Sequence, residues 1–347
     1  MNVVVLGGTR FVGPYVVRLL AERGHEVTIV HRGETEAELP RVVRHLHVAF
    51  ERLPEALERL RSVAVDVVLD MVPYLDKGGH GVLHFAGVAD RAVAITSCDV
   101  YRAFGRLWRS EPGPPDSLPL TEESPLRSRP AADAGSEDVV HDNVDVEKAL
   151  AGGPLPVTIL RLPATHGPGD PQHRLFRYLK RMDDRRPAIV LEERFARWRW
   201  TRGYVENVAA AIALAVEDED GRAAGRVYNV ADPTVHAEAD WVRRIGEAAG
   251  WSGEIVTIPA ADLPERLRQP YDFDQDYVVD STRIRDELGY GEPVDEDTAL
   301  ERTIEWERRN PPAGAPAPDY AAEDEALAAY CGPSASRPRR EDHERTT

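Results

Sequence analysis

A glycine-rich run near the amino terminus is the first segment whose residue types and spacing point to chemistry. The run lies directly between the apolar segment Asn2–Leu6 and a segment with helical periodicity, and it reads Gly7-Gly8-Thr9-Arg10-Phe11-Val12-Gly13. In a strand–turn–helix unit, Gly7 can form the tight turn and Gly13 can let the helix pack closely on the sheet. The amide groups at the start of that helix would face an anion, so we expect Gly7, Gly8, Gly13 and the helix start to bind the pyrophosphate of a dinucleotide. All seven residues are candidates for cofactor binding. A purely structural glycine turn is the alternative.

The residues after the second apolar segment bear on the choice of dinucleotide. They are His31, Arg32 and Gly33. An acidic residue here would hold the ribose 2′-hydroxyl of NAD. No carboxylate stands at these three positions, and Arg32 can pair with a 2′-phosphate through two hydrogen bonds. We therefore expect NADP to be favoured over NAD, unless Arg32 stacks on the adenine or lies in solvent.

Residues 166–202 concentrate polar and aromatic side chains. Arginine suits a pyrophosphate, and aromatic rings suit the face of a base or a sugar. The candidate substrate-binding residues are His166, Asp170, Arg174, Trp198 and Arg202. The alternative is a surface strand rich in tryptophan and arginine that packs on a neighbouring helix. The spacing of the histidines and the aspartate in this segment matches no compact metal motif, so we predict no metal site.

Such residues need a scaffold, and the first hundred residues alternate short apolar strands with amphipathic helices. This alternation is typical of βαβ units and of a parallel sheet covered on both faces. Strands are expected at 2–6, 26–30, 44–50, 63–69, 91–96, 157–162 and 226–230, and helices at 15–22, 54–61, 137–150, 205–216, 240–249 and 298–308. We predict an α/β fold, a Rossmann-type doubly wound parallel sheet with a smaller mixed C-terminal substrate domain.

The chain divides into three expected regions. Residues 1–165 would form the dinucleotide-binding domain and 166–310 the substrate-binding region. Within the first region, the proline-rich stretch 104–136 reads as a long surface loop. Residues 311–347 are rich in proline and alanine and then charged, so we expect a poorly ordered tail.

The net charge, the apolar runs and the cysteine content limit the kinds of partner and the compartment that we expect. The 347 residues carry a net charge of −17, which repels phosphate backbones and makes nucleic acid an unfavourable partner. No apolar run is long enough for a membrane helix, and no signal peptide is expected at the start. The cysteines, Cys98 and Cys331, cannot build a disulfide scaffold or a structural zinc site, so a reducing cytoplasm is expected. Cys98 is a candidate nucleophile or, more simply, a small core residue.

Several short motifs occur in an order that resembles the extended short-chain dehydrogenase/reductase superfamily, in its epimerase/dehydratase branch. They are the glycine run, Thr96–Tyr101, Arg161–Pro163, His166–Asp170, Arg202–Ala209 and Tyr228–Val230. The usual pattern TGGxGFxG is altered here by Leu6 and Arg10. That variant resembles an atypical subgroup that includes the chloroplast stem-loop binding proteins.

The resemblance implies a Rossmann domain to which some C-terminal segments return. It also implies two further dinucleotide contacts. One is Thr96, at the end of a strand, and the other is Glu51, where the family often carries an acid that contacts adenine.

The resemblance further implies a catalytic hydroxyl and a Tyr-x-x-x-Lys pair, in which the tyrosine transfers the proton. Ser97, four residues before Tyr101, matches the hydroxyl. No lysine of this chain has a tyrosine four residues before it; His141 or Val139 stands near the expected tyrosine and Asn143 near the expected lysine.

The candidates for acid/base chemistry beside Ser97 are therefore non-standard. His141 titrates near neutrality, and Tyr74 follows a strand at the carboxyl edge of the sheet, where ligands of such folds bind. Tyr101 is the third candidate. The alternative is that the chain keeps the nucleotide site and has lost hydride-coupled chemistry.

Together these observations predict an NAD(P)-dependent epimerase, dehydratase or reductase. Its substrate would be a small molecule, a nucleotide-activated sugar or a related polar alcohol, and the protein a cytoplasmic homodimer. The alternative is a dinucleotide-binding protein without redox turnover. An RNA-associated protein is one form of this alternative, and the net charge of −17 opposes RNA binding.

Overall fold

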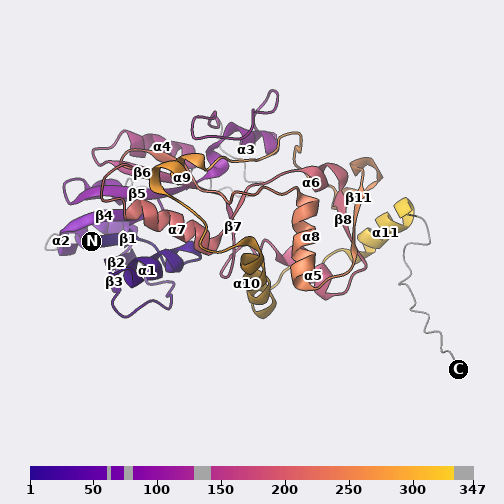
Figure 1. The fold of residues 1–347 in the computed structure, drawn as a ribbon, viewed down its shortest axis with the longest axis horizontal. Helices are drawn as coiled ribbons and strands as arrows, with labels where there is room; N and C mark the ends of the chain where they lie inside the picture. Colours follow the sequence, from indigo (N-terminus) through magenta and orange to yellow (C-terminus); the bar gives the residue numbers. More distant parts are fainter. Residues whose placement is uncertain (61–63, 74–80, 129–141, 332–347) are drawn as a thin grey trace.

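The fold is built on a parallel sheet of seven strands. The structure is a computed structural model, and it describes residues 1–60, 64–73, 81–128 and 142–331. The strand order is β10-β6-β5-β4-β1-β2-β3 (Figure 1). The strands are β1 (Asn2–Leu6), β2 (Glu26–His31), β3 (Arg44–His47), β4 (Val65–Asp70), β5 (Ala89–Ser97), β6 (Val157–Leu162) and β10 (Val227–Asn229). This order and the parallel pairing confirm the predicted Rossmann-type α/β fold.

The register of the strands aligns their carboxyl ends. Leu6 lies opposite both Val30 and Asp70, and Asp70 lies opposite Ala94. The residues that follow β1, β2, β4 and β5 therefore meet at one edge of the sheet. In a doubly wound sheet, this is the edge at which ligands bind.

Helices cover both faces of the sheet (Figure 1). The apolar sides of α1 (Val12–Glu22), α7 (Val205–Val216) and α9 (Thr282–Leu288) share one core with one face of the strands. The other face packs on α2 (Leu53–Leu60), α4 (Asn143–Ala151) and the short 3-10 helix η2 (Gly81–Phe85). Because both of its faces are buried, β1 is a continuous apolar run rather than an alternating one, whereas the edge strand β3 is mostly exposed and alternates.

The C-terminal half has its own core. Two small parallel sheets lie here, β8 (Ala188–Glu192) with β11 (Glu254–Ile258) and β7 (Ala164–His166) with β9 (Arg202–Tyr204). The helices of this half are α5 (Phe176–Asp183), α6 (Glu193–Arg197), α8 (Glu238–Ala249), α10 (Glu296–Arg309) and α11 (Tyr320–Cys331). The helix α3 (Arg102–Leu107) of the first half packs into the same core. The remaining short 3-10 helices are η1 (Phe50–Arg52), η3 (Cys98–Val100), η4 (Ala260–Asp262) and η5 (Glu265–Leu267).

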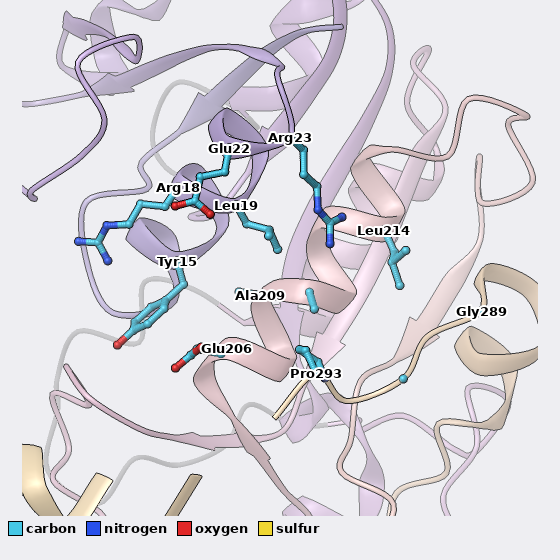
Figure 2. Close-up of a pocket in the computed structure, with 12 residues that line it drawn as sticks. Tyr15, Arg18, Leu19, Glu22, Arg23, Glu206, Ala209, Leu214, Gly289 and Pro293 are labelled. Carbon is cyan, nitrogen blue, oxygen red and sulfur yellow. The ribbon is translucent and has the colours of Figure 1, made fainter. Parts of the chain in front are cut away.

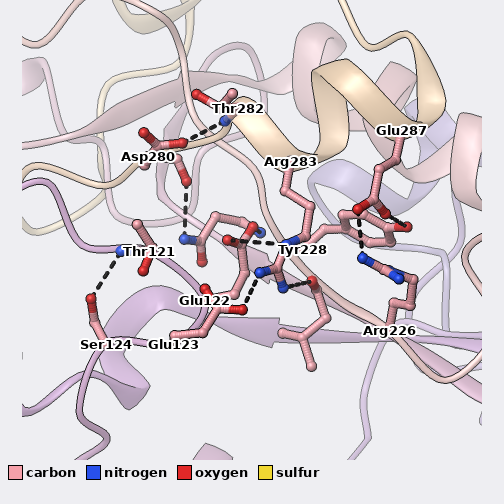
Figure 3. A network of polar contacts seen from close by, with 12 residues as sticks. Thr121, Glu122, Glu123, Ser124, Arg226, Tyr228, Asp280, Thr282, Arg283 and Glu287 are labelled. Atoms are coloured by element: carbon pink, nitrogen blue, oxygen red, sulfur yellow. Dashed lines mark hydrogen bonds and ion pairs between the residues drawn. The ribbon is translucent and has the colours of Figure 1, made fainter.

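Polar contacts fasten the last strand of the large sheet to segments far away in the sequence (Figure 3). Glu287 of α9 accepts hydrogen bonds from the Tyr228 hydroxyl at 2.7 Å and from Arg226 at 2.5 Å. Arg283 of the same helix pairs with Glu123, and Glu122 accepts the Asn229 amide at 2.9 Å. Residues 226–230 and α9 thus lie on the sheet of the first half.

The region after residue 311 differs from the expected poorly ordered tail. The helix α11 packs on β8, β11 and η5, with Ala322 and Ala326 buried. Glu323 is also buried, and it pairs with Arg181 of α5 at 2.5 Å. Alanine favours the helix, and its small side chain permits close docking, so an alanine-rich composition did not imply disorder. Residues 332–347 lie outside the described residues.

The stretch expected to be one long loop, 104–136, contains part of α3 and then runs irregularly to residue 128, the last described before the next gap. The following helix, expected from 137, is described from Asn143 as α4. Asp142 precedes it and accepts the Val144 amide at 2.8 Å, which is the hydrogen bond of an N-cap. Among the described helices, none is long and apolar enough to cross a membrane.

Candidate functional site

The glycine turn lies between β1 and α1 with the geometry of a close backbone approach. Gly7 and Gly8 have φ values of +84° and +85°, which favour glycine. A Cβ at Gly13 would come within 2.6 Å of the Gly8 backbone, so the helix start and the turn are nearly in contact. No side chain caps α1, and its first turn carries no acidic residue. The positive end of α1 therefore suits the pyrophosphate of a dinucleotide, while the Gly13 amide itself donates to the Arg10 carbonyl at 3.0 Å.

The other residues of the run support this geometry. Phe11 precedes α1 with φ 46° and ψ −105°, a strained conformation of the kind that collects at ligand-binding turns. The Thr9 hydroxyl lies 2.7 Å from that of Thr35, which ties the turn to the β2–β3 connection. Arg10 is exposed, and Val12 is buried in the core beneath the turn.

Arg32 follows β2 at the same edge of the sheet, as expected. Its side chain is about half exposed, and it pairs with Glu34 at 2.8 Å. Of the other two cofactor candidates, Thr96 is buried and donates its hydroxyl hydrogen bond to Glu147 at 2.8 Å. That contact gives Thr96 a role inside the protein. The side chain of Glu51 lies outside what the structure describes.

Ser97 and Asp99 stand at the carboxyl end of β5. The Ser97 hydroxyl accepts the Asp99 amide at 3.2 Å and caps η3. The Asp99 carboxylate accepts the side-chain amide of Asn143, at the start of α4, with its two oxygens at 3.0 and 3.2 Å. Arg127 lies 3.7 Å from the same carboxylate. A hydroxyl, a carboxyl and an amide thus converge where the expected tyrosine and lysine are missing.

Burial raises the pKa of Asp99 to about 6, although hydrogen bonds from Asn143 and the charge of Arg127 act against this rise. A carboxyl group that titrates near neutrality can both donate and accept a proton under ordinary conditions. Asp99 is the functional candidate that sequence reasoning missed. It is the second residue after Ser97, and nothing in its type alone distinguishes it from the chain's many other aspartates.

Tyr101 is fully buried beneath this site. Its hydroxyl donates to the Asn229 side chain at 2.5 Å and accepts from Arg161 at 2.9 Å. Burial raises the pKa of Tyr101 well above its usual value. These contacts suit a residue that holds strands β6 and β10 together rather than one that transfers a proton. Tyr74 and His141, the other two acid/base candidates, lie outside the described residues.

Cys98 is buried next to Ser97, and its thiol donates to the Arg161 carbonyl at 3.4 Å. Burial raises the pKa of the thiol. A buried, protonated thiol is a poor nucleophile, so the geometry favours a core role.

The five substrate candidates are not brought together. Trp198 is a core residue whose indole donates to the Gln275 carbonyl at 2.8 Å. Asp170 is buried and fixes its own loop, accepting from Gln172 at 3.0 Å and from Arg174 at 2.7 Å. For Trp198, Asp170 and Arg174 the structure favours the packing alternative, because the indole and the carboxylate have partners within the protein and Arg174 pairs with Asp170.

His166 and Arg202 line one small cavity in the C-terminal half. Its volume is about 220 Å³, and Asp232, His236 and Trp241 also face it. Arg202 pairs with Glu238 and stacks on Trp241, with its guanidinium 4.7 Å from the ring centre. Burial, with the charges of Arg202 and Arg174, lowers the pKa of His166 to about 3. The residues that line this cavity do not include the glycine turn or Ser97.

A larger hollow of about 510 Å³ lies on the outer side of α1 and α7 (Figure 2). Tyr15, Arg18 and Leu19 line it from α1, Glu206 and Ala209 from α7. These are the residues of α1 that face away from the sheet. The hollow is therefore separate from the ligand-binding edge of the sheet.

A family model matches much of this arrangement. The model of the NAD dependent epimerase/dehydratase family covers residues 3–101 and 144–231, more than half of the chain. The matched residues include the glycine turn, Ser97 and the strands of the large sheet. The chain belongs to the NAD-dependent epimerase/dehydratase family. The family resemblance inferred from the motifs is thereby confirmed, and it places the chain among NAD-dependent enzymes.

Relatives from the same comparisons differ in function. The chain is 26% identical over 289 residues to 2′-dehydrokanamycin reductase of Streptomyces kanamyceticus, covering 82% of this chain and 75% of the relative. UDP-glucose 4-epimerase of Thermotoga maritima, solved with UDP-glucose, has a TM-score of 0.64 at 18% identity, covering 89% of this chain and 99% of that one. dTDP-glucose 4,6-dehydratase of Bacillus anthracis, solved with NAD, has a TM-score of 0.64 at 15% identity, covering 89% and 97%. The two solved structures show that this epimerase/dehydratase family member shares their fold.

Proposed function

We propose that the chain is an NAD(P)-dependent oxidoreductase or epimerase that interconverts an alcohol and a ketone on a nucleotide-activated sugar or a related polar alcohol. The observation that carries this proposal is the pairing of two sites at one edge of the sheet. One is the pyrophosphate-binding turn at Gly7–Gly13. The other is the Ser97–Asp99–Asn143 cluster at the end of β5.

The dinucleotide would be held by the amides of the glycine turn and by the start of α1. When bound, its nicotinamide supplies the hydride chemistry of the family. The Arg32 side chain supports NADP over NAD, because it is half exposed after β2 and forms an exposed ion pair with Glu34. An exposed pair of this kind is weak, so a 2′-phosphate can compete for the guanidinium.

The proton chemistry would fall to Asp99. Its carboxyl group, with a pKa of about 6, would donate a proton to a ketone oxygen or accept one from an alcohol. Ser97 would hold the substrate oxygen by a hydrogen bond. Asn143 and Arg127 would position the carboxyl and stabilise its charged form. This assignment replaces the missing Tyr-x-x-x-Lys pair with a carboxyl group.

The substrate class rests on the relatives. The reductase of Streptomyces kanamyceticus is named for 2′-dehydrokanamycin, and the epimerase of Thermotoga maritima was solved with UDP-glucose. Both names point toward sugar hydroxyl or ketone groups. The mixed C-terminal half of this chain would bind the rest of such a substrate.

Native mass spectrometry of the purified full chain, followed by a turnover assay, tests this function. We expect NADP or NAD to remain bound, and we expect the reduced form to be oxidised in the presence of a ketone from a panel of nucleotide-linked and free keto sugars. The dinucleotide could instead bind without turnover of any compound in the panel, and the variants of Ser97 and Asp99 could bind dinucleotide and ligand as the parent does. These two results together would favour a non-catalytic dinucleotide-binding protein. No affinity for either dinucleotide would overturn the proposal.

A further inference from the structure

Three histidines and one glutamate gather at the outer edge of the large sheet, apart from the Ser97–Asp99 cluster. They are His31 at the end of β2, His45 and His47 on β3, and Glu36 on the connection between these strands. One ligand atom from each of the four residues lies within 4.8 Å of the others. Figure 1 shows β2 and β3 at the outer edge of the sheet beside α1. This histidine cluster has no role in the function proposed above.

The parallel register explains why the cluster forms. His31 lies directly opposite His47, and His45 is two residues earlier on the same strand, so all three rings project from one face. Leu46 and Val48, which alternate with them, pack on the other face. The segment 33–43, eleven of the twelve residues between β2 and β3, passes over the histidine face, where Leu39 and Val43 join the core and Glu36 reaches the rings. The sheet therefore fixes three of the donors, and the connection brings the fourth.

The spacing of the donor atoms fits a tetrahedral metal site. His31 Nε2 lies 3.1 Å from His45 Nδ1, and the Glu36 carboxylate lies 3.3 Å from His47 Nε2 and 3.7 Å from His45 Nδ1. Metal–ligand bonds of about 2.0–2.2 Å place neighbouring ligand atoms about 3.3–3.6 Å apart at the corners of a tetrahedron. Three of the separations are already close to this range. The widest pair needs to close by roughly 1 Å, which the exposed side chains of Glu36 and His47 permit.

The donor types select the metal. Three imidazole nitrogens and one carboxylate are ligands of Zn²⁺ and of similar first-row divalent ions, whereas Mg²⁺ and Ca²⁺ require mainly oxygen. Four protein ligands would leave no open position for a substrate or a water, as in structural rather than catalytic sites. The chain's net charge of −17 also favours cations at its surface.

Two contacts must change when a metal binds. The hydrogen bond between His31 Nε2 and His45 Nδ1 must release its proton, because both nitrogens would bind the metal. The Gly33 amide points at His31 Nδ1 at 3.3 Å, whereas binding through Nε2 would put the ring proton on Nδ1. That contact is long, and Gly33 has a φ of +80° with no atom closer than 3.5 Å to a Cβ placed there. The peptide therefore has room to turn away.

We propose that His31, Glu36, His45 and His47 form a structural binding site for Zn²⁺ or a similar divalent transition metal, which staples the β2–β3 connection to the edge of the sheet. The metal would link Glu36, near the middle of an irregular eleven-residue segment, to two neighbouring strands. This would hold the connection beside Arg32. The site requires neither a dinucleotide nor a substrate.

Titration of the untagged, metal-free full chain with Co²⁺ or Zn²⁺ alone tests this proposal. We expect one equivalent of Co²⁺ to produce the intense visible absorption of a tetrahedral nitrogen and oxygen site, and Zn²⁺ to displace it. Zn²⁺ should raise the melting temperature because it binds only the folded cluster. Mg²⁺ and Ca²⁺ should do neither. Because no dinucleotide is present, the outcome does not depend on the proposed function.

The variant pair His45→Gln with His47→Gln should weaken Zn²⁺ binding by at least about 100-fold, more than the loss of an outer-shell partner. Glu36→Gln should weaken it to a smaller extent. The control is His84→Gln, which replaces an exposed histidine on η2 outside the cluster and should bind as the parent does. Both altered side chains of the double variant are on the surface side of β3, and circular dichroism checks that it folds. Equal Zn²⁺ affinity in the double variant and the control, octahedral Co²⁺ spectra, or no binding would each overturn the site.

Discussion

Individual side chains decide whether the proposed chemistry is feasible. The family's tyrosine transfers a proton because a lysine and the nicotinamide lower its pKa, whereas burial raises the pKa of Tyr101. It is buried between Asn229 and Arg161. For Asp99 the shift has the opposite direction, because burial raises the pKa of its carboxyl group to about 6. In the proposed function, this carboxyl group takes the place of the tyrosine as the proton donor or acceptor, and Asn143 takes the place of the lysine.

Asp99→Asn should lower turnover by about 10²–10⁴-fold, the usual contribution of a general acid or base, while dinucleotide affinity stays unchanged. The pH dependence carries a sign. Ketone reduction needs the protonated carboxyl and should fall as the pH rises above about 6, whereas alcohol oxidation needs the carboxylate and should fall below about 6. Steady-state kinetics over a pH series measures both limbs.

The matched control for this prediction is Asp145→Asn, which changes an exposed aspartate on α4 that pairs only with Lys148. It should keep the parent's rate and pH profile. If Asp99→Asn retains the rate, or loses it without any change of the pH profile, proton transfer belongs to another group.

Arg32 governs the expected choice between dinucleotides. Arg32→Gln should weaken NADP binding by about 1–3 kcal/mol, the worth of a hydrogen bond to a charged group, and leave NAD nearly unchanged. Glu34→Gln should strengthen NADP binding, because it frees Arg32 from its ion pair. Calorimetry with both dinucleotides measures this difference. Arg41→Gln, an exposed arginine on the same connection, is the control, and equal losses for NADP and NAD in Arg32→Gln would remove Arg32 from this role.

At the scale of elements, the junction of β1 and α1 combines two requirements. The backbone must turn sharply at Gly7 and Gly8, and the helix must then begin almost in contact with that turn at Gly13. Strain at Phe11 belongs to the same junction.

Gly13→Ala should abolish dinucleotide binding, because the new Cβ would lie 2.6 Å from the Gly8 backbone and push the turn away from α1. Overpacking of this kind also destabilises a protein by about 1–3 kcal/mol, so binding is compared with the unfolding free energy of the same variant. Gly291→Ala is the control, since its Cβ would meet no atom within 4 Å. Parent-like affinity in Gly13→Ala would show that the pyrophosphate does not depend on this contact.

The helix α11 makes a second prediction at this scale. Ala326 is buried against β8 and β11, whereas Ala328 is exposed on the same helix. Ala326→Asp should therefore lower the unfolding free energy by about 1–3 kcal/mol, because it buries a polar group without a partner. Ala328→Asp has the same helix propensity and should be nearly neutral. Denaturant unfolding compares them, and equal stabilities would mean that α11 is not docked in solution.

At the scale of the whole molecule, the parallel sheet could be predicted and much of the candidate site could not. The inner strands can be recognised in the sequence because a sheet that is buried on both faces needs continuous runs of β-branched residues, as in Asn2–Leu6. Polar residues give no such signal about what they face. The types of Asp170 and Trp198 suit a ligand, yet the fold turns both toward protein partners.

The features that could not be predicted depend on contacts between segments that are distant in the sequence. Asp99 acquires its raised pKa from burial, and it meets Asn143 only once α4 lies on the sheet. The histidine cluster depends on the β2–β3 register, which spacing along the chain does not show. The tail was misjudged because an alanine-rich helix and an alanine-rich coil have the same composition. Its docking on β8 and β11 is a tertiary property.

The stability of the whole molecule in acid should depend on His166. Burial lowers its pKa from 6.5 to about 3, so between these values the unfolded chain binds a proton that the folded chain does not. Stability should therefore be lost as the pH falls through this window, by up to about 1.4 kcal/mol per pH unit. Asp70 and Asp232 act in the opposite sense, because their pKa values rise from 3.8 to about 7 and their protonated forms favour the fold. Their contribution is common to the parent and to a His166 variant, so a difference between the two chains isolates the histidine.

His166→Gln keeps a polar group near Thr303, whose hydroxyl lies 3.4 Å from His166 Nδ1, and removes the titration. The unfolding free energies of this variant and of the parent are measured from pH 7 down to the onset of acid unfolding. The value of the variant minus that of the parent should increase as the pH falls below 6.5. His84→Gln, at an exposed histidine on η2, is the control and should run parallel to the parent throughout. A constant offset between His166→Gln and the parent would mean that His166 is protonated equally in both states. In that case water would reach the His166 ring in the folded chain through the cavity that the ring lines.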